Sequence, residues 1–155
     1  MEEPKKNQQR IRPKTFSFQT GLRWLGGRKG ELRAGEAKPA LLVGSPPEFK
    51  GDPENLSPED LFLAAISVCQ MTTFVALAER AGLEFSSYED SCQGVMEVVE
   101  GKLVFTRVVL HPKVAIRSAE DRDRALELIN EAHKKCAIAN SASCEVEVEP
   151  EIIVV

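Results

Sequence analysis

Residues 57–82, SPEDLFLAAISVCQMTTFVALAERAG, form the stretch around which the rest of the chain is organised. Ser57 can cap the first turn of a helix, a proline suits the first helical position, and Gly82 provides a stop. No charged residue occurs between Leu61 and Ala78, and almost no polar face remains. The stretch therefore predicts a long central helix that is buried on nearly all sides.

This uncharged run reaches roughly 18 residues, the length at which a membrane span becomes a candidate. Polar residues interrupt the middle of the run, and charged residues follow it directly. Helix-capping residues typical of soluble proteins stand at both ends of the helix. It also lacks an aromatic belt and a basic flank. We therefore interpret the helix as the core of a soluble domain and predict no membrane association.

The composition indicates one globular domain, because the chain has 155 residues, of which 43% are hydrophobic and 28% charged. Its net charge of −4 argues against nucleic acid as a partner. Residues 1–14 are polar and lack the apolar core of a secretory signal. They predict a flexible tail before a single domain at 15–155, and a cytoplasmic location.

The four cysteines do not indicate a disulfide framework or a zinc ribbon, because the chain is not a short secreted one and contains no CxxC pair. His133 and Cys136 have the spacing of metal ligands on a helix, but no second pair accompanies them. A nucleotide-binding fingerprint is also absent from the sequence. We therefore expect neither a metal nor a cofactor.

Short strands are predicted before the central helix and longer ones after it. Residues 15–43 predict a three-strand antiparallel meander with a Gly-rich turn, and residues 44–58 a long Pro- and Gly-rich surface loop. Residues 85–99 and 102–116 predict two long strands that form a hairpin around Glu100 and Gly101.

A second, amphipathic helix is predicted to begin at Ser118, with an apolar stripe that ends on Cys136. The alternation in EVEVEPEII at 145–153 predicts a final strand near a sheet edge. This order of elements gives an α+β fold with a mainly antiparallel sheet. One sheet and one amphipathic helix can hardly cover a helix that is apolar all round, so we expect a second copy of the chain to cover it.

Cys69 and Cys136 both lie on apolar helix faces, where a cysteine most often serves as a small core residue. Cys69 differs because a glutamine and two threonines lie beside it, and a buried helix carries such polar groups when they face a cavity. Cys92 and Cys144 fall in predicted strands, and we expect them to have packing roles.

Two segments resemble one known family. SPEDLFLAAISVC at 57–69 is similar to the sequence that leads to the first cysteine of the OsmC/Ohr family, the osmotically inducible and organic-hydroperoxide-resistance proteins. AHKKCAIANS at 132–141 resembles the segment that carries the second cysteine. The resemblance covers roughly residues 16–149. It implies an OsmC-like fold, an intertwined homodimer with active sites at the subunit interface, and a thiol peroxidase that reduces organic hydroperoxides.

The resemblance also implies roles for individual residues. Cys69 looks like the peroxidatic cysteine, Cys136 like the resolving cysteine, and Glu59 like the active-site glutamate. The family's site includes an arginine, for which Arg28 in the stretch GGRKG is the candidate. Other basic residues remain alternatives for that position: Arg23, Arg33 and Lys50. The oxidised site would be reduced by an external dithiol, of the lipoyl type in this family.

The physical chemistry agrees with these roles. Cys69 lies too far inside its helix to gain from the N-terminal dipole, so burial would raise its pKa unless a cation stood close. An arginine would supply that charge, and Glu59 would orient it through a bidentate pair. Glu59 and Cys69 are separated along one straight helix by ~15 Å. Either the first turn bends away, or the glutamate comes from a partner's antiparallel helix.

One departure from the family pattern is Ala137, because in many relatives a proline follows the second cysteine. Two rival functions also stay open. One is a redox-sensing or small-ligand-binding dimer without efficient turnover, and the other is a purely structural dimer. The polar cluster around Cys69 argues against the structural dimer, and only turnover separates the sensor from the peroxidase.

Overall fold

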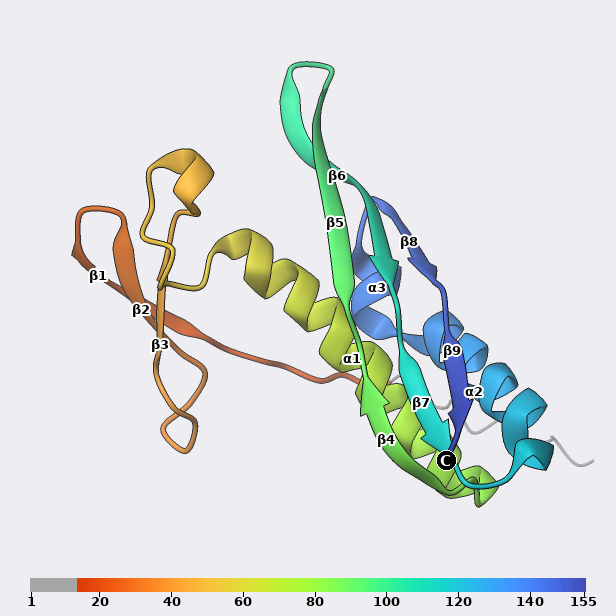
Figure 1. The fold of residues 1–155 in the computed structure, drawn as a ribbon. Coiled ribbons are helices and arrows are strands. Elements are labelled where there is room, and N and C mark those ends of the chain that lie inside the picture. The colour runs from red at the N-terminus through yellow and green to blue at the C-terminus, as the bar shows by residue number, and fades with distance from the viewer. Residues whose placement is uncertain (1–13) are drawn as a thin grey trace, which may run out of the picture.

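The structure, a computed structural model, describes residues 14–155. The flexible tail predicted for residues 1–14 lies outside the described residues apart from Lys14. Within the described part, the chain has an α+β fold in which a long helix links a separate meander to a layer of strands and helices (Figure 1). The elements are β1 (Gly21–Gly26), β2 (Lys29–Arg33), β3 (Leu41–Gly44), η1 (Pro47–Phe49), α1 (Pro58–Ala81), β4 (Phe85–Glu89), β5 (Cys92–Val99), β6 (Lys102–Leu110), β7 (Lys113–Ile116), η2 (Ala119–Asp121), α2 (Arg122–Lys135), α3 (Ala137–Ser141), β8 (Glu145–Val148) and β9 (Glu151–Val154).

The first three strands form the antiparallel meander that the sequence predicts, in the order β1-β2-β3. Gly26 and Gly27 close its first turn with φ angles of 104° and 53°, a conformation that glycine adopts without strain. β1 begins at Gly21 and not near residue 15, because residues 14–20 form no strand. The meander stands away from the later strands (Figure 1).

Helix α1 confirms the predicted central helix and its ends. Ser57 and Asp60 form a capping box, in which Ser57 Oγ accepts from the Asp60 N–H at 3.1 Å and the Asp60 carboxylate accepts from the Ser57 N–H at 2.9 Å. Gly82 ends the helix at φ 66°. With a mean hydropathy of 2.0 over 18 residues, α1 is long and apolar enough for a membrane span. It nevertheless packs on α2, α3 and β5 of the same chain, as a core helix does.

Strands β5 and β6 form the predicted hairpin around Glu100 and Gly101, both at positive φ. However, the strand predicted at 85–99 is divided into β4 and β5, and the strand predicted at 102–116 is divided into β6 and β7. The division occurs where Pro112 has no N–H to donate and the His111 N–H bonds Asp90 Oδ1 at 2.9 Å. The result is two successive three-stranded sheets, ordered β4-β7-β9 and β5-β6-β8.

The single final strand predicted near a sheet edge is also divided, at Pro150, into β8 and β9. Both halves lie at sheet edges, as expected. They run parallel to β6 and β7, so the mainly antiparallel arrangement includes two parallel pairs. The parallel direction follows from the crossover through α2 and α3, because a chain that returns over a helix enters the sheet in the same direction.

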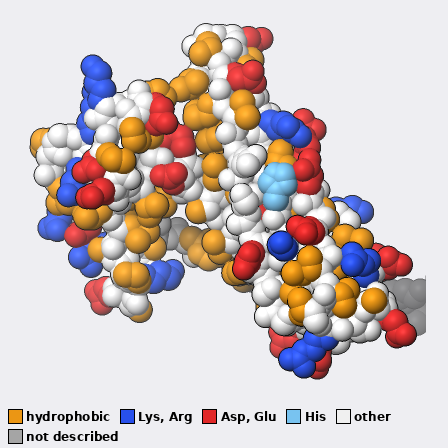
Figure 2. Space-filling model, viewed as in Figure 1, with side chains coloured by type: hydrophobic (Ala, Val, Ile, Leu, Met, Phe, Trp, Pro, Cys, Tyr) orange, Lys and Arg blue, Asp and Glu red, His pale blue; other side chains and the backbone are white. Residues whose placement is uncertain are grey.

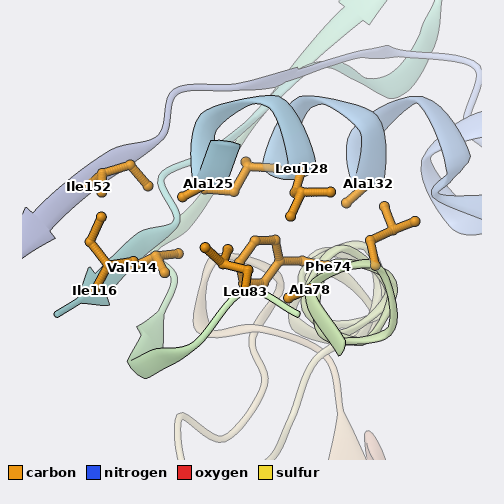
Figure 3. Close-up of a cluster of buried hydrophobic side chains, with 11 residues drawn as sticks. Phe74, Ala78, Leu83, Val114, Ile116, Ala125, Leu128, Ala132 and Ile152 are labelled. Carbon is orange, nitrogen blue, oxygen red and sulfur yellow. The ribbon is translucent and has the colours of Figure 1, made fainter. Parts of the chain in front are cut away.

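The second helix starts one turn later than predicted. Ser118 caps the 3-10 turn η2, and α2 begins at Arg122. Cys136 ends α2 and begins α3, so the helical stripe does end on this cysteine. Phe74 of α1 is fully buried in the apolar cluster between α1, α2 and the strands (Figure 3). This cluster fixes the two cysteine-bearing helices against each other.

One long face of α1 remains uncovered in the single chain. Only 22% of its most apolar window is buried, and Val68, Met71 and Val75 are 55%, 37% and 38% exposed. Exposed hydrophobic side chains also lie over the meander and the hairpin (Figure 2). The prediction that the helix is buried on nearly all sides is therefore wrong for one copy of the chain, because α2, α3 and β5 cover only one side of it.

Candidate functional site

Cys69 lies on α1 at the border between the buried and the exposed face. Ile66 and Gln70, both fully buried, lie on one side of it, and Val68 lies on the exposed side. Helical geometry of about 3.6 residues per turn makes Cys69 and Thr73 neighbours along this border. The Cys69 side chain is half-buried and contacts the start of α3. Its sulfur is therefore partly covered by its own chain and partly open to whatever covers α1.

Cys136 lies fully buried at the junction of α2 and α3. Its extended backbone, with φ −67° and ψ 105°, interrupts the helical path. Its Sγ accepts from the Ala139 N–H at 3.5 Å and so takes the place of the oxygen that usually caps a helix. The Cys69 thiol lies close enough to this sulfur for the two thiols to shift each other's pKa. The junction thus places the second thiol next to the first.

The pKa values of the two thiols move in opposite directions. Burial raises the pKa of Cys69, but hydrogen bonds to its sulfur outweigh burial and hold the pKa below its usual value. The donors are the backbone N–H groups of Ile138 and Ala137, the thiol of Cys136 and the hydroxyl of Thr73. Burial, followed by the interaction with Cys69 and its charge, raises the pKa of Cys136 against the opposing backbone N–H groups of Ala139 and Ile138. Cys69 therefore ionises first, while Cys136 keeps its proton.

These hydrogen-bond donors bear on whether a cation is needed to lower the pKa of Cys69. The sequence predicts a raised pKa for Cys69 unless a positive charge stands close. In the structure, backbone N–H groups after Cys136 lower the pKa of Cys69, and no arginine or lysine of residues 14–155 contributes to this shift. The sequence did not indicate this, because it does not show that the chain after α2 turns back onto α1. A cation is therefore not required for Cys69 to ionise before Cys136.

Glu59 lies in the first turn of α1, far along the helix from Cys69. It lines an open pocket of about 430 Å³ between the loop before α1 and the β5–β6 hairpin. The apolar side chains around it include Phe49, Met96 and Phe105. Glu59 Oε2 is buried and has no hydrogen-bond partner among residues 14–155. A buried carboxylate oxygen without a hydrogen-bond donor costs free energy. A donor group placed beside Glu59 at the start of α1 would therefore be stabilising.

Arg28 lies beside the same loop. Its Nη1 donates to the carbonyl oxygen of Phe49 at 2.7 Å, and Phe49 lines the Glu59 pocket. The bidentate pair expected between Arg28 and Glu59 is not among the ion pairs of the described chain. A carbonyl does not neutralise a guanidinium, so no carboxylate of residues 14–155 balances the charge of Arg28.

The alternatives to Arg28 have other surroundings. Arg23 and Arg33 both pair with Glu31, at 3.1 Å and 3.0 Å. Hydrogen bonding and charge, led by the Arg33 hydrogen bond, hold the pKa of Glu31 below its usual value. Lys50 is exposed on the loop at φ 63°. The two arginines of β1 and β2 are therefore already matched to an acid within the meander, unlike Arg28.

Two polar residues beside the site escaped sequence reasoning. The Asp90 carboxylate accepts from the Ser67 hydroxyl of α1 and from the His111 N–H. Tyr88 carries a buried hydroxyl without a partner in the described residues, and burial, then Asp90 and Cys136, raise its pKa. A serine in an apolar helix predicts some acceptor but not which one. Over residues 14–155, no three His, Cys, Asp or Glu side chains are grouped as for a metal ion.

Comparison with known proteins gives a consistent picture. The model of the OsmC-like protein family matches residues 51–151. The uncharacterized protein YmaD of Bacillus subtilis is 26% identical over 139 residues, which span 86% of this chain and 91% of YmaD.

Solved structures share the fold over nearly the whole chain. An OsmC-like protein of unknown function from Vibrio cholerae matches with a TM-score of 0.79 at 25% identity, covering 88% of this chain and 99% of that one. An organic hydroperoxide resistance protein from Elizabethkingia anophelis matches with a TM-score of 0.71 at 20% identity, covering 92% and 99%. OhrB of Bacillus subtilis matches with a TM-score of 0.63 at 23% identity, covering 88% and 98%.

Proposed function

The chain belongs to the OsmC-like protein family, as its two cysteine-bearing segments predict, and from this membership we propose that it is a thiol-dependent peroxidase that reduces organic hydroperoxides to alcohols. Two structures with the same fold are those of proteins named for organic hydroperoxide resistance. Their identity to this chain supports the fold, and the activity rests on the arrangement of the thiols.

The observation that carries the proposal is the contact between Cys69 and Cys136. One thiol has a lowered pKa and a partly open sulfur, and the other has a raised pKa and is fully buried. A peroxide reacts with a thiolate, whereas a resolving cysteine can remain a thiol until a sulfenic acid forms next to it. The two environments therefore suit a nucleophile and its resolving partner.

The reaction then proceeds in two steps within the chain. The Cys69 thiolate attacks the terminal peroxide oxygen, so that an S–O bond forms and the O–O bond breaks. The alkoxide takes a proton and leaves as the alcohol. The Cys136 thiol condenses with the Cys69 sulfenic acid, forming the disulfide and releasing water. An external dithiol, of the lipoyl type implied by the family resemblance, reduces the disulfide by exchange and is itself oxidised to a disulfide.

The site is completed by a second copy of the chain in this proposal. The exposed apolar face of α1 needs a cover, and residues 14–155 of one copy offer neither a donor to Glu59 Oε2 nor an acid to Arg28. A homodimer in which α1 of one copy lies antiparallel to α1 of the other would bring Glu59 near the partner's cysteine. Glu59 would then orient Arg28 toward the peroxide, where the guanidinium donates to the peroxide oxygens.

The decisive experiment is steady-state consumption of an alkyl hydroperoxide by the purified protein, with dihydrolipoamide as the reductant. We expect turnover of the organic substrate to exceed that of hydrogen peroxide, and Cys69→Ser to abolish it. Cys136→Ser should allow one oxidation and then stop. If the native protein oxidises once and stops with every dithiol supplied, the peroxidase proposal is wrong and the redox-sensing dimer replaces it.

A further inference from the structure

Gln70, the residue after Cys69, is fully buried on the face of α1 that packs against α2. Its side-chain Nε2 donates to the backbone carbonyl oxygen of Ile129 in α2 at 3.1 Å. Ile129 belongs to the apolar cluster between α1, α2 and the strands (Figure 3). The sequence indicates a polar group beside Cys69 but not its partner, because 59 residues separate the two ends of this bond.

This hydrogen bond meets α2 two helical turns before Cys136. Residues two turns apart lie on the same side of a helix, and Ile129 and Cys136 are both fully buried. The Ile129 carbonyl points toward the turn that contains His133. The Cys136 N–H in turn donates to the His133 carbonyl oxygen at 3.2 Å. The Gln70 amide therefore holds the last turn of α2, to which Cys136 is attached.

We propose that Gln70 is a positioning residue, whose hydrogen bond to α2 keeps the Cys136 thiol within reach of Cys69 and so speeds the formation of their disulfide. The inference rests on the proposed function, in which Cys136 is the resolving cysteine. It gives Gln70 no part in the first step, the attack by Cys69.

The other end of the same side chain favours a positioning role over a stabilising one. Gln70 Oε1 is buried and has no hydrogen-bond partner among residues 14–155, which costs free energy. The Ile129 carbonyl lies inside a helix and has a helical donor without the amide. An apolar side chain of the same size would fill the site without this cost. The amide instead fixes one register between α1 and α2, because its hydrogen bond forms only at one position.

Formation of the disulfide depends on that register. Two cysteines can be bridged without movement of the backbone only when their Cα atoms lie within about 7 Å and their Cβ atoms point toward each other. A hydrogen bond between neutral groups changes an equilibrium constant by a factor of roughly three to ten. Loss of the Gln70 amide should slow the condensation by up to this factor, because the aligned arrangement becomes less populated.

The test separates the two steps with Ellman's reagent, an aromatic disulfide. The Cys69 thiolate attacks the reagent, forms a mixed disulfide and releases one coloured thiolate. Cys136 then loses its proton and attacks the Cys69 sulfur, so that the Cys69–Cys136 disulfide forms and the second coloured thiolate leaves. Cys136→Ser should show only the first release, which assigns the second release to Cys136.

Gln70→Met removes the amide and keeps an unbranched side chain of similar length. We expect its first release to match that of the native protein and its second to be roughly three- to tenfold slower. Its free energy of unfolding should be unchanged or higher, because the unpaired Oε1 is removed as well. A merely structural role predicts the opposite, a loss of stability with an unchanged second release.

Gln70→Glu and Ile66→Val complete the set of variants. The protonated carboxyl of Gln70→Glu can donate to the Ile129 carbonyl, whereas the ionised carboxylate cannot. Its second release, relative to that of the native protein, should therefore slow as the pH rises. Ile66 is fully buried on α1 but packs on β6, away from the amide. Ile66→Val should lower the free energy of unfolding and leave both releases at native rates.

The outcomes separate this inference from the proposed function. Ellman's reagent replaces both peroxide and dithiol, so a slower second release in Gln70→Met alone supports the inference even if no hydroperoxide is consumed. Equal second releases in Gln70→Met and the native protein overturn it even if the protein is a peroxidase. Equal slowing in Ile66→Val also overturns it, because this would indicate a general effect on the fold. A native protein without a second release overturns the inference and the redox pair together.

Discussion

Replacing Ala137 with proline removes a backbone N–H that helps to lower the pKa of Cys69. Ala137 is the first residue of α3, where proline is well tolerated because the first helical N–H bonds no helical carbonyl. The residue before it, Cys136, already has an extended backbone with φ −67° and ψ 105°, close to the conformation that precedes proline. The fold should therefore persist while the N–H is lost.

The size of the effect follows from the contacts of Cys69. A hydrogen bond to a charged group contributes about 1.5–3 kcal/mol, and about 1.4 kcal/mol corresponds to one pKa unit. Among the groups that lower the pKa of Cys69, the Ala137 N–H contributes least. The Cys69 side chain is also half exposed to solvent. Water can replace part of the lost interaction, so we expect Ala137→Pro to raise the pKa by about half a unit to one unit.

The assay is a pH titration of the ultraviolet absorbance of the thiolate, taken as the difference between each protein and the same protein with Cys69→Ser. Ala137→Gly is the matched control, because it alters the same side chain and keeps the N–H. The pKa of Cys69 should rise in Ala137→Pro and stay near the native value in Ala137→Gly. An unchanged pKa in Ala137→Pro would refute the argument that backbone donors, rather than a cation, set the ionisation of Cys69.

Three further predictions test other parts of the structure. Burial, then Asp90, raise the pKa of Cys92 to about 11, so Cys92 stays a thiol at pH 9. It should be alkylated there far more slowly than Cys69, and Asp90→Asn should accelerate it. Phe74→Ala should lower the free energy of unfolding in urea by about 3–5 kcal/mol, because Phe74 is fully buried; a loss below 1 kcal/mol would contradict its place in the core. Mixing inactive Cys69→Ser and Glu59→Gln dimers, with subunit exchange, should restore about a quarter of the native activity if each site combines two copies; no recovery would place the whole site in one chain.

Much of the fold is encoded in local signals. The capping serine and the terminal glycine fix the ends of α1, and Glu100-Gly101 fixes the hairpin turn, because each acts through its own backbone conformation. The division of the long strands was not predictable in the same way. Pro112 indicates a break in the second strand, but the matching break in the first depends on Asp90 accepting from the His111 N–H, which is a contact between distant residues.

The candidate site was predictable to a similar extent. The polar residues around Cys69 and the resemblance of two segments pointed to the two cysteines. The backbone donors of residues 137–138 were not predictable, because every residue has an N–H and only the path of the chain directs it. The surroundings of Glu59 and Arg28 were not predictable either, because residues 14–155 place no donor at Glu59 Oε2 and pair Arg28 with a carbonyl oxygen.

The central claim is that Cys69 and Cys136 form one redox pair, and a single-turnover experiment tests it directly. The reduced protein is treated with one equivalent of an alkyl hydroperoxide, and its disulfides are mapped by mass spectrometry of unreduced peptides. The account predicts a Cys69–Cys136 cross-link within one chain, and in Cys136→Ser a sulfenic acid at Cys69 that dimedone traps. The claim would be contradicted if Cys92 or Cys144 were oxidised before Cys69, or if the protein stayed fully reduced.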